Sequence, residues 1–182
     1  MEVMTMIQLT KEAFDHFSKN QDQLDEFIRE KKGIRLDDWD NELFYERAHL
    51  IALHNEVNEF VNECRDVWKY WKEKPIDYEK LKDELVDVIH FLHLNMNKTF
   101  RNSRVISRDK TREAINNRIR ELKNKYVSID LLAILAVEPT INEIYALLLT
   151  AADQLYGMTM EEIVEAYDIK NADNYKRQQT GW

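Results

Sequence analysis

The sequence predicts an all-α fold, a four-helix core with additional helices, in a single domain spanning residues 1–182. Only three Gly and two Pro occur in the chain, whereas β-sandwiches and barrels need many turns. Apolar side chains recur at three- and four-residue steps over most of the chain, which is typical of amphipathic helices. A chain of this length buries about 70% of the surface of its unfolded state, so it needs no disulfide or structural zinc to fold.

Six helices are predicted from these steps and from the positions of capping residues. Their expected spans are residues 10–32, 38–71, 78–100, 129–137, 139–156 and 159 onward. The expected N-terminal caps are Thr10, then Asp38 or Asp40, then Asp77, and finally Thr159 in a capping box with Glu162. Pro139 suits the first turn of its helix, where a backbone N–H is not needed.

The second and third predicted helices have continuous apolar faces. We expect the second to bury Leu43, Leu50, Leu53, Val57, Phe60, Val61, Cys64 and Trp68. We expect the third to bury Leu81, Leu85, Val88, Ile89, Leu92 and Met96. Apolar stripes on nearly every helix exceed what one small bundle needs, which favours a subunit interface.

Residues 101–127 differ from the rest of the chain because nine Lys and Arg side chains gather there with few apolar partners. This composition indicates a basic insert that lies on the surface or is mobile, and that is partly helical at residues 111–125. The insert is a candidate docking surface for a protein partner. The polar tail, residues 170–182, follows the last apolar stripe and ends in Trp182.

The net charge of −8 excludes general electrostatic binding of nucleic acid. No apolar run reaches the roughly 18 residues of a membrane span, and the N-terminus lacks the layout of a signal peptide. Cys64 is the only cysteine, so no intramolecular disulfide can form. We therefore expect a reducing, cytoplasmic location.

Two pairs of acids stand out within apolar stretches: Glu56 with Glu59, and Glu84 with Asp87. Residues three apart project from one face of a helix, and the short connection between the two helices places them side by side and antiparallel. Four carboxylates would then face one another, and such hard oxygen ligands suit Mg²⁺. Either pair taken alone is more often a solvated flank of an amphipathic helix.

Three segments resemble one known family. They are the run Glu59 to Lys72 with its Trp68-Lys69-Tyr70-Trp71, the run Glu84-Leu85-Val86-Asp87-Val88-Ile89-His90-Phe91, and the tail from Ala166 to Trp182. Together with the acid pairs, they are similar to the dimeric all-α dUTPases, within the all-α NTP pyrophosphatases that include MazG-like enzymes. The chain departs from that family in its final aromatic, usually Tyr, and in about one extra residue between Glu63 and Trp71.

The resemblance implies that Glu56, Glu59, Glu84 and Asp87 bind Mg²⁺, and that a metal-bound water, helped by Glu56, attacks the α-phosphorus. It also implies residues that bind the substrate: Gln21 at the uracil edge, Asn62, Trp68 and His90 around the nucleotide, and Lys170, Asn174 and Arg177 at the phosphates or sugar. Ordinary structural roles stay open for several of these residues. Gln21 can be a boundary residue, Trp68 can fill the core, and His90 can be a hydrogen-bonded core histidine.

The activity implied is hydrolysis of dUTP to dUMP and pyrophosphate by a Mg²⁺-dependent homodimer. Two alternatives remain open at this point. The first is a sibling pyrophosphatase that acts on dCTP or on a broader set of nucleoside triphosphates. The second is a helical regulator without enzymatic activity that binds another protein, although a pure binding module has no need of four converging carboxylates.

Overall fold

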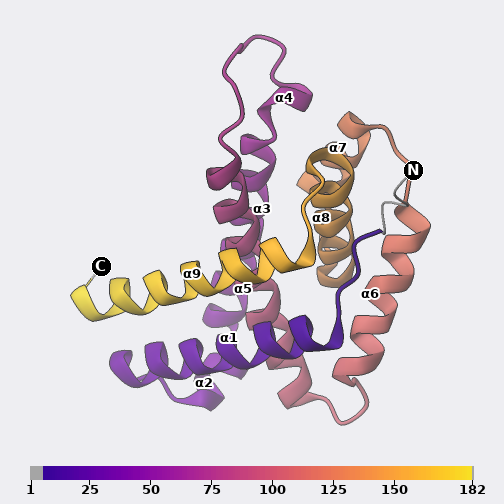
Figure 1. Cartoon of the computed structure of the whole chain (residues 1–182). Coiled ribbons are helices and arrows are strands. Elements are labelled where there is room, and N and C mark those ends of the chain that lie inside the picture. Colours follow the sequence, from indigo (N-terminus) through magenta and orange to yellow (C-terminus); the bar gives the residue numbers. More distant parts are fainter. Residues whose placement is uncertain (1–5, 182) are drawn as a thin grey trace.

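The computed structural model describes residues 6–181, and over these residues it contains nine helices and no strand (Figure 1). The all-α prediction is confirmed. The helices in chain order are α1 (Lys11–Lys32), α2 (Leu36–Asn41), α3 (Leu43–Glu63), α4 (Arg65–Trp68), α5 (Tyr78–Asn102), α6 (Arg108–Leu122), α7 (Ser128–Val137), α8 (Ile141–Tyr156) and α9 (Met160–Thr180).

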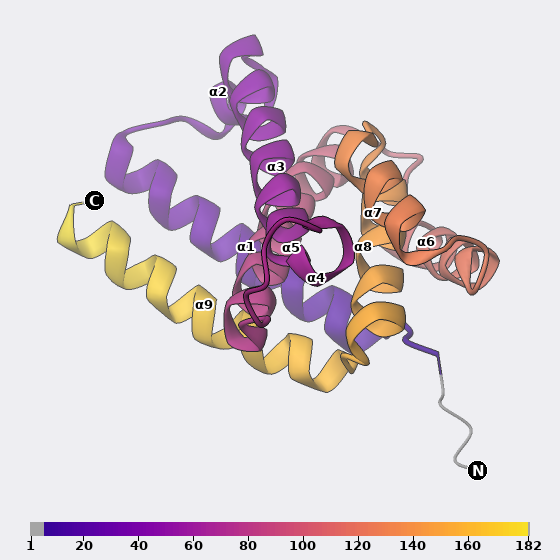
Figure 2. The same ribbon diagram turned by 90° about the horizontal axis from the view of Figure 1, so that it is seen from above.

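Helix α5 is the centre of the fold, because it packs against α1, α3, α8 and α9. Its six predicted core residues, from Leu81 to Met96, are all buried. Helices α3 and α5 lie side by side and antiparallel, joined beyond the far end of α3 by α4 and a loop (Figure 1). Helices α1 and α9 pack on each other and cross α5 (Figure 2). The fold therefore brings α1, α3, α5 and α9 around the acid pairs.

The prediction of one continuous helix over residues 38–71 is wrong, because the chain breaks at Glu42 and again at Cys64. Glu42 has an extended backbone, with φ −75° and ψ 133°. The break lets α2 turn Trp39 and Asp40 into the protein, where Trp39 packs 4.4 Å from the His49 ring. Asp40 accepts two hydrogen bonds from Arg101, at 2.8 and 2.7 Å. These contacts with α3 and α5 outweigh the local preference for a longer helix.

The expected caps of this segment are also wrong. Asp40 is paired with Arg101, and Asp38 accepts hydrogen bonds from the Arg35 side chain. Arg35 and Glu42 occupy the N-cap positions of α2 and α3 instead. Leu43, predicted to be buried, is 63% exposed, because the break rotates the first turn of α3 away from the core.

Helix α6 corrects the expectation of a basic insert on the surface. It packs against α8, and Ile115, Ile119 and Leu122 are buried in the common core. Asn116 is buried as well and exchanges two hydrogen bonds of 2.9 Å with the backbone of Leu9. The cations that dominate the composition lie on the outer side of α6 and in the flanking turns. Their number in the sequence obscured the apolar periodicity of the helix, so its buried face was not predicted.

The other helix ends largely follow the sequence. Thr10 and Asp77 cap α1 and α5, and Thr159 with Glu162 forms the capping box of α9. Pro139 differs from the prediction: α8 begins at Ile141 with Thr140 as its N-cap, so Pro139 lies before the first turn. Among the residues described, no helix is long and apolar enough to cross a membrane. Trp182 lies outside the described residues.

Candidate metal and nucleotide site

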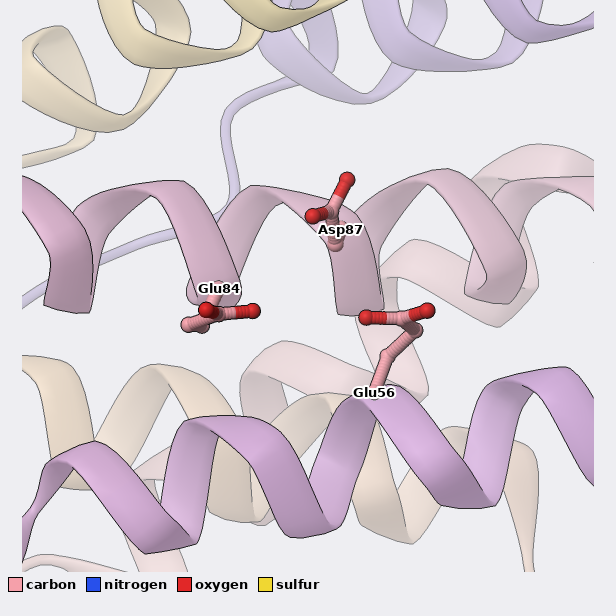
Figure 3. Close-up of side chains that lie close together, drawn as sticks. All are labelled: Glu56, Glu84 and Asp87. Carbon is pink, nitrogen blue, oxygen red and sulfur yellow. The ribbon is translucent and has the colours of Figure 1, made fainter. Parts of the chain in front are cut away.

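Three of the four predicted carboxylates come together between α3 and α5. Glu56 projects from α3 toward Glu84 and Asp87 on α5 (Figure 3). One oxygen from each of the three lies within 4.8 Å of the others, a spacing at which they could hold one metal ion. Buried Val57 and Phe60 on α3, and Leu85 on α5, fix the faces from which the acids project. The three side chains are referred to below as the acid cluster.

The electrostatics of the acid cluster favour a bound cation. Glu84 is buried, and Glu56 and Asp87 are half-buried. Burial, reinforced by the charges of Asp87, Glu59 and Glu84, raises the pKa of Glu56 to about 7. Burial, then the charges of Glu59 and Asp87, also raise the pKa of Glu84. A divalent cation would reverse these shifts, because it stabilises the charged form of each carboxylate.

Glu59, the fourth predicted ligand, is exposed and is not among the three side chains that converge. Its charge nevertheless contributes to the raised pKa of both Glu56 and Glu84. Glu59 therefore borders the acid cluster, one turn along α3 from Glu56.

Lys170 reaches the acid cluster from α9. Its Nζ lies 2.6 Å from Asp87 Oδ2 and 2.8 Å from Asp83 Oδ2, and the residue is only 5% exposed. Burial alone lowers the pKa of a lysine, but the hydrogen bonds to Asp83 and Asp87 outweigh burial and raise the pKa of Lys170. The lysine predicted to bind phosphate is thus a cation that already neutralises one of the candidate metal ligands.

The two other tail residues lie farther along α9. Asn174 is half-buried one turn beyond Lys170, and Arg177 is exposed about one turn farther. Burial raises the pKa of Asp87, whereas the charges of Lys170 and Arg177 lower it. Arg177 is therefore near enough to act electrostatically on the acid cluster, as a phosphate-binding residue would.

Gln21 and His90 are joined directly. Gln21 Oε1 lies 2.7 Å from His90 Nδ1, and Gln21 Nε2 donates a hydrogen bond of 2.7 Å to Asp25 Oδ1. The His90 ring stacks on Tyr167 of α9, with centroids 4.2 Å apart. Sequence reasoning missed Asp25. Its position four residues after Gln21, on the same face of the helix, was the available signal.

Asn62 and Trp68 have local partners at the far end of α3. Asn62 is exposed and accepts a hydrogen bond from Lys69. Trp68 is half-buried, packs against Trp71 and donates a hydrogen bond of 2.8 Å to the Val61 carbonyl. Six residues of helix, a rise of about 9 Å, separate Asn62 from Glu56. The contacts of Asn62 and Trp68 are therefore local ones, and the role of these two residues in substrate binding stays a prediction.

The fold and the acid cluster define an all-α protein with a candidate site for a divalent metal between two antiparallel helices. A search of curated proteins finds no match to the chain. The family model described as dUTPase matches residues 13–182, nearly the whole chain. The chain therefore belongs to the all-α dUTPase family and is a dUTP diphosphatase, which confirms the family resemblance of its sequence.

Proposed function

We propose that this enzyme hydrolyses dUTP to dUMP and pyrophosphate with Mg²⁺ held by Glu56, Glu84 and Asp87, and with Glu59 as a fourth ligand. The observation that carries the proposal is the convergence of three carboxylates within 4.8 Å in a chain of the dUTPase family. Carboxylate oxygens suit Mg²⁺, which completes its coordination with water and substrate phosphates. When bound, the ion would neutralise phosphate charge and lower the pKa of water.

Other steps of the proposed reaction depend on the protein's own side chains, which would orient the water and bind the phosphates. Glu56, the one member of the acid cluster that comes from α3, would help to orient the attacking water and to accept its proton. Lys170, Asn174 and Arg177 present two cations and an amide from α9 toward the triphosphate. Lys170 would exchange its ion pair with Asp87 for one with a phosphate oxygen once Asp87 binds a metal ion.

We propose that Gln21 and His90 bind the base, because both are buried, hydrogen-bonded to each other and close to the acid cluster. His90 lies three residues after Asp87, on the same side of α5. Tyr167 stacks on His90, and Phe17 of α1 packs 4.6 Å from Tyr167. Tyr167 of α9 covers the His90 ring, so we expect α9 to move away when the base enters and to close over the nucleotide.

A panel of nucleoside triphosphates tests both the base and the metal. We expect kcat/KM for dUTP to exceed that for dCTP and dTTP by at least about 10²-fold, because a site built to hydrogen-bond one base edge leaves buried polar groups unpaired with another. Pyrophosphate release would be measured with Mg²⁺, and with EDTA as the matched control. Equal kcat/KM for dCTP would favour the sibling pyrophosphatase, and full activity in EDTA would contradict the metal assignment.

We propose that the enzyme is a homodimer whose interface includes the outer face of α3. This face exposes large apolar side chains at the start of the helix and two turns later: Leu43, Phe44 and Ile51. Phe44 is the most exposed of the three, at 71%. Exposed apolar patches of this kind are typical of protein interfaces, and buried aromatics often dominate their binding energy.

Phe44→Glu and Ile51→Glu are expected to convert the dimer to a monomer, because each buries a charge in an apolar interface. Sedimentation velocity would measure the mass. Val105→Glu is the matched control, since Val105 is also an exposed apolar residue but lies in the loop before α6, and we expect it to leave the dimer intact. A wild-type monomer at assay concentrations, or dissociation by the control alone, would contradict the proposed interface.

Three broader expectations also stay proposals. We propose a single domain, because α6 shares the core of the other helices. We propose a reducing, cytoplasmic environment, and the burial of Cys64, which raises its pKa to about 12, keeps the thiol unreactive there. The exposed cations around α6 are the surface we propose for a protein partner: Arg104, Arg108, Lys110, Arg120, Lys123 and Lys125.

A further inference from the structure

Asp25 has no assigned role, although it is 2% exposed and lies in the middle of α1. Its Oδ1 accepts the hydrogen bond from Gln21 Nε2, and its Oδ2 has no hydrogen-bond partner among the described residues. Burial raises its pKa to about 7, against the opposing effect of Gln21. A carboxyl group this deeply buried is costly, so its single strong contact, with Gln21, is the feature to explain.

The contact with Asp25 fixes the orientation of the Gln21 amide. With Asp25 ionised, or protonated at its unpartnered Oδ2, Oδ1 only accepts hydrogen bonds, so the NH₂ group of Gln21 faces it. The amide oxygen then faces His90 Nδ1 at 2.7 Å. An amide oxygen is only an acceptor, and His90 Nδ1 must therefore carry the proton.

The tautomer of His90 follows from this chain of contacts. Burial, followed by the charge of Lys170, lowers the pKa of His90 to about 3, so the ring is neutral. A neutral ring protonated at Nδ1 has a bare lone pair at Nε2. His90 Nε2 is buried and has no hydrogen-bond partner among the described residues. The network thus ends in an unsatisfied acceptor beside the acid cluster.

We propose that Asp25 is a positioning residue that sets base specificity, by holding Gln21 so that His90 Nε2 accepts a hydrogen bond from the base. This inference rests on the proposed binding of the base by Gln21 and His90. A pyrimidine with a protonated ring nitrogen, such as uracil, supplies the N–H that the acceptor needs. The corresponding nitrogen of cytosine carries a lone pair, which His90 Nε2 would repel. Asp25 thereby keeps His90 in the tautomer whose Nε2 accepts a hydrogen bond from the base and cannot donate one.

The test compares Asp25→Leu, which removes the acceptor, with Asp25→Asn, whose side-chain oxygen can still accept from Gln21. Asp15→Ala is the control, because Asp15 is a half-exposed aspartate on the same helix that pairs with Lys11. The first readout is the ¹⁵N NMR signal of the His90 ring in nucleotide-free enzyme, assigned with His90→Gln. We expect a protonated Nδ1 and a bare Nε2 in wild type, Asp25→Asn and Asp15→Ala, and loss of this single tautomer in Asp25→Leu.

The second readout is the ratio of kcat/KM for dUTP to that for dCTP at fixed Mg²⁺. We expect Asp25→Leu to lower the ratio by about 10-fold, the size expected for one misplaced hydrogen bond, mainly through a higher KM for dUTP. Asp25→Asn and Asp15→Ala should retain the ratio. A protonated Nε2 in wild type would overturn the inference. So would an unchanged ratio in Asp25→Leu, or an equal loss in Asp25→Asn, which would mean that charge rather than position matters.

The two readouts separate this inference from the proposed function. The tautomer is measured without nucleotide and can be wrong while the enzyme remains a Mg²⁺-dependent dUTPase. Circular dichroism of each variant identifies a folding defect, and Asp25→Asn, which keeps the shape of the side chain, remains informative if Asp25→Leu does not fold.

Discussion

Glu84→Gln and Asp87→Asn are each expected to lower kcat for dUTP by at least about 10³-fold, a loss of roughly 4 kcal/mol of transition-state stabilisation. Each substitution keeps the shape of the side chain and removes a negative charge from the acid cluster. A neutral amide holds a divalent cation far less strongly than a carboxylate does, and the cation would carry much of the charge stabilisation. Pyrophosphate release over a range of Mg²⁺ concentrations measures the effect.

Glu84→Gln should fold as well as the wild type, and Asp87→Asn should keep the helical fold although it removes one of the two carboxylate partners of Lys170. Burial and like charges raise the pKa of Glu84, which means that its charge is unfavourable in the metal-free fold. Replacing Glu84 with an amide relieves that repulsion, so the thermal midpoint in EDTA should stay level or rise. Glu79→Gln, at an exposed carboxylate of the same helix that pairs with Lys82, is the control. Near-normal activity of Glu84→Gln in Mg²⁺ would rule out the acid cluster as the metal site.

A chain truncated before Lys170 is expected to retain its dimer and most of its helical signal but to lose most of its activity. The truncation removes Lys170, Asn174 and Arg177 together. Each lost charge-assisted contact with phosphate costs about 1.5–3 kcal/mol, so two cations account for roughly 10²- to 10⁴-fold in kcat/KM. The removal leaves the main apolar core in place, because none of the buried core residues lies beyond Tyr167. The ring contact of Tyr175 with Phe27, at 5.2 Å, is lost with the segment.

Single substitutions separate the contributions within this segment. Lys170→Met keeps the aliphatic stem and removes the charge. We expect it to lower kcat/KM for dUTP by about 10- to 10²-fold. Lys176→Met is the matched control, since Lys176 is exposed on the same helix and pairs only weakly, with Asp173 at 3.3 Å. Stopped-flow measurements of pyrophosphate release would give kcat and KM separately. Full activity of the truncated chain would show that the segment is only a surface helix.

Local signals in the sequence predicted what lies on a single helix. The face of α5 from Leu81 to Met96 follows from its three- and four-residue steps, and the spacing of Glu84 and Asp87 places both on one side. The break at Glu42 was not predictable in this way. It depends on Asp40 meeting Arg101, 61 residues away along the chain, and on the packing of Trp39.

The same distinction holds within the candidate site. Gln21 and His90 were singled out, but their mutual hydrogen bond joins residues 69 positions apart. The pairing of Lys170 with Asp83 and Asp87 depends on how α9 crosses α5, which no local pattern encodes. Asp25 was overlooked because an aspartate on a helix is usually solvated, and only the packing of α9 over α1 reveals that it is buried.

The crossing of α1 and α9 has a consequence for how the enzyme acquires its activity during folding. His16 and Asp168 lie 2.6 Å apart across 152 positions, and Tyr167 donates a hydrogen bond to the Phe17 carbonyl across 150 positions. Individual helices form within about a microsecond, whereas contacts between such distant segments require the closure of a very long loop. We therefore expect the candidate nucleotide site to be among the last parts of the molecule to form. A partly folded chain would already be helical while α9, and with it Lys170, had yet to reach the acids.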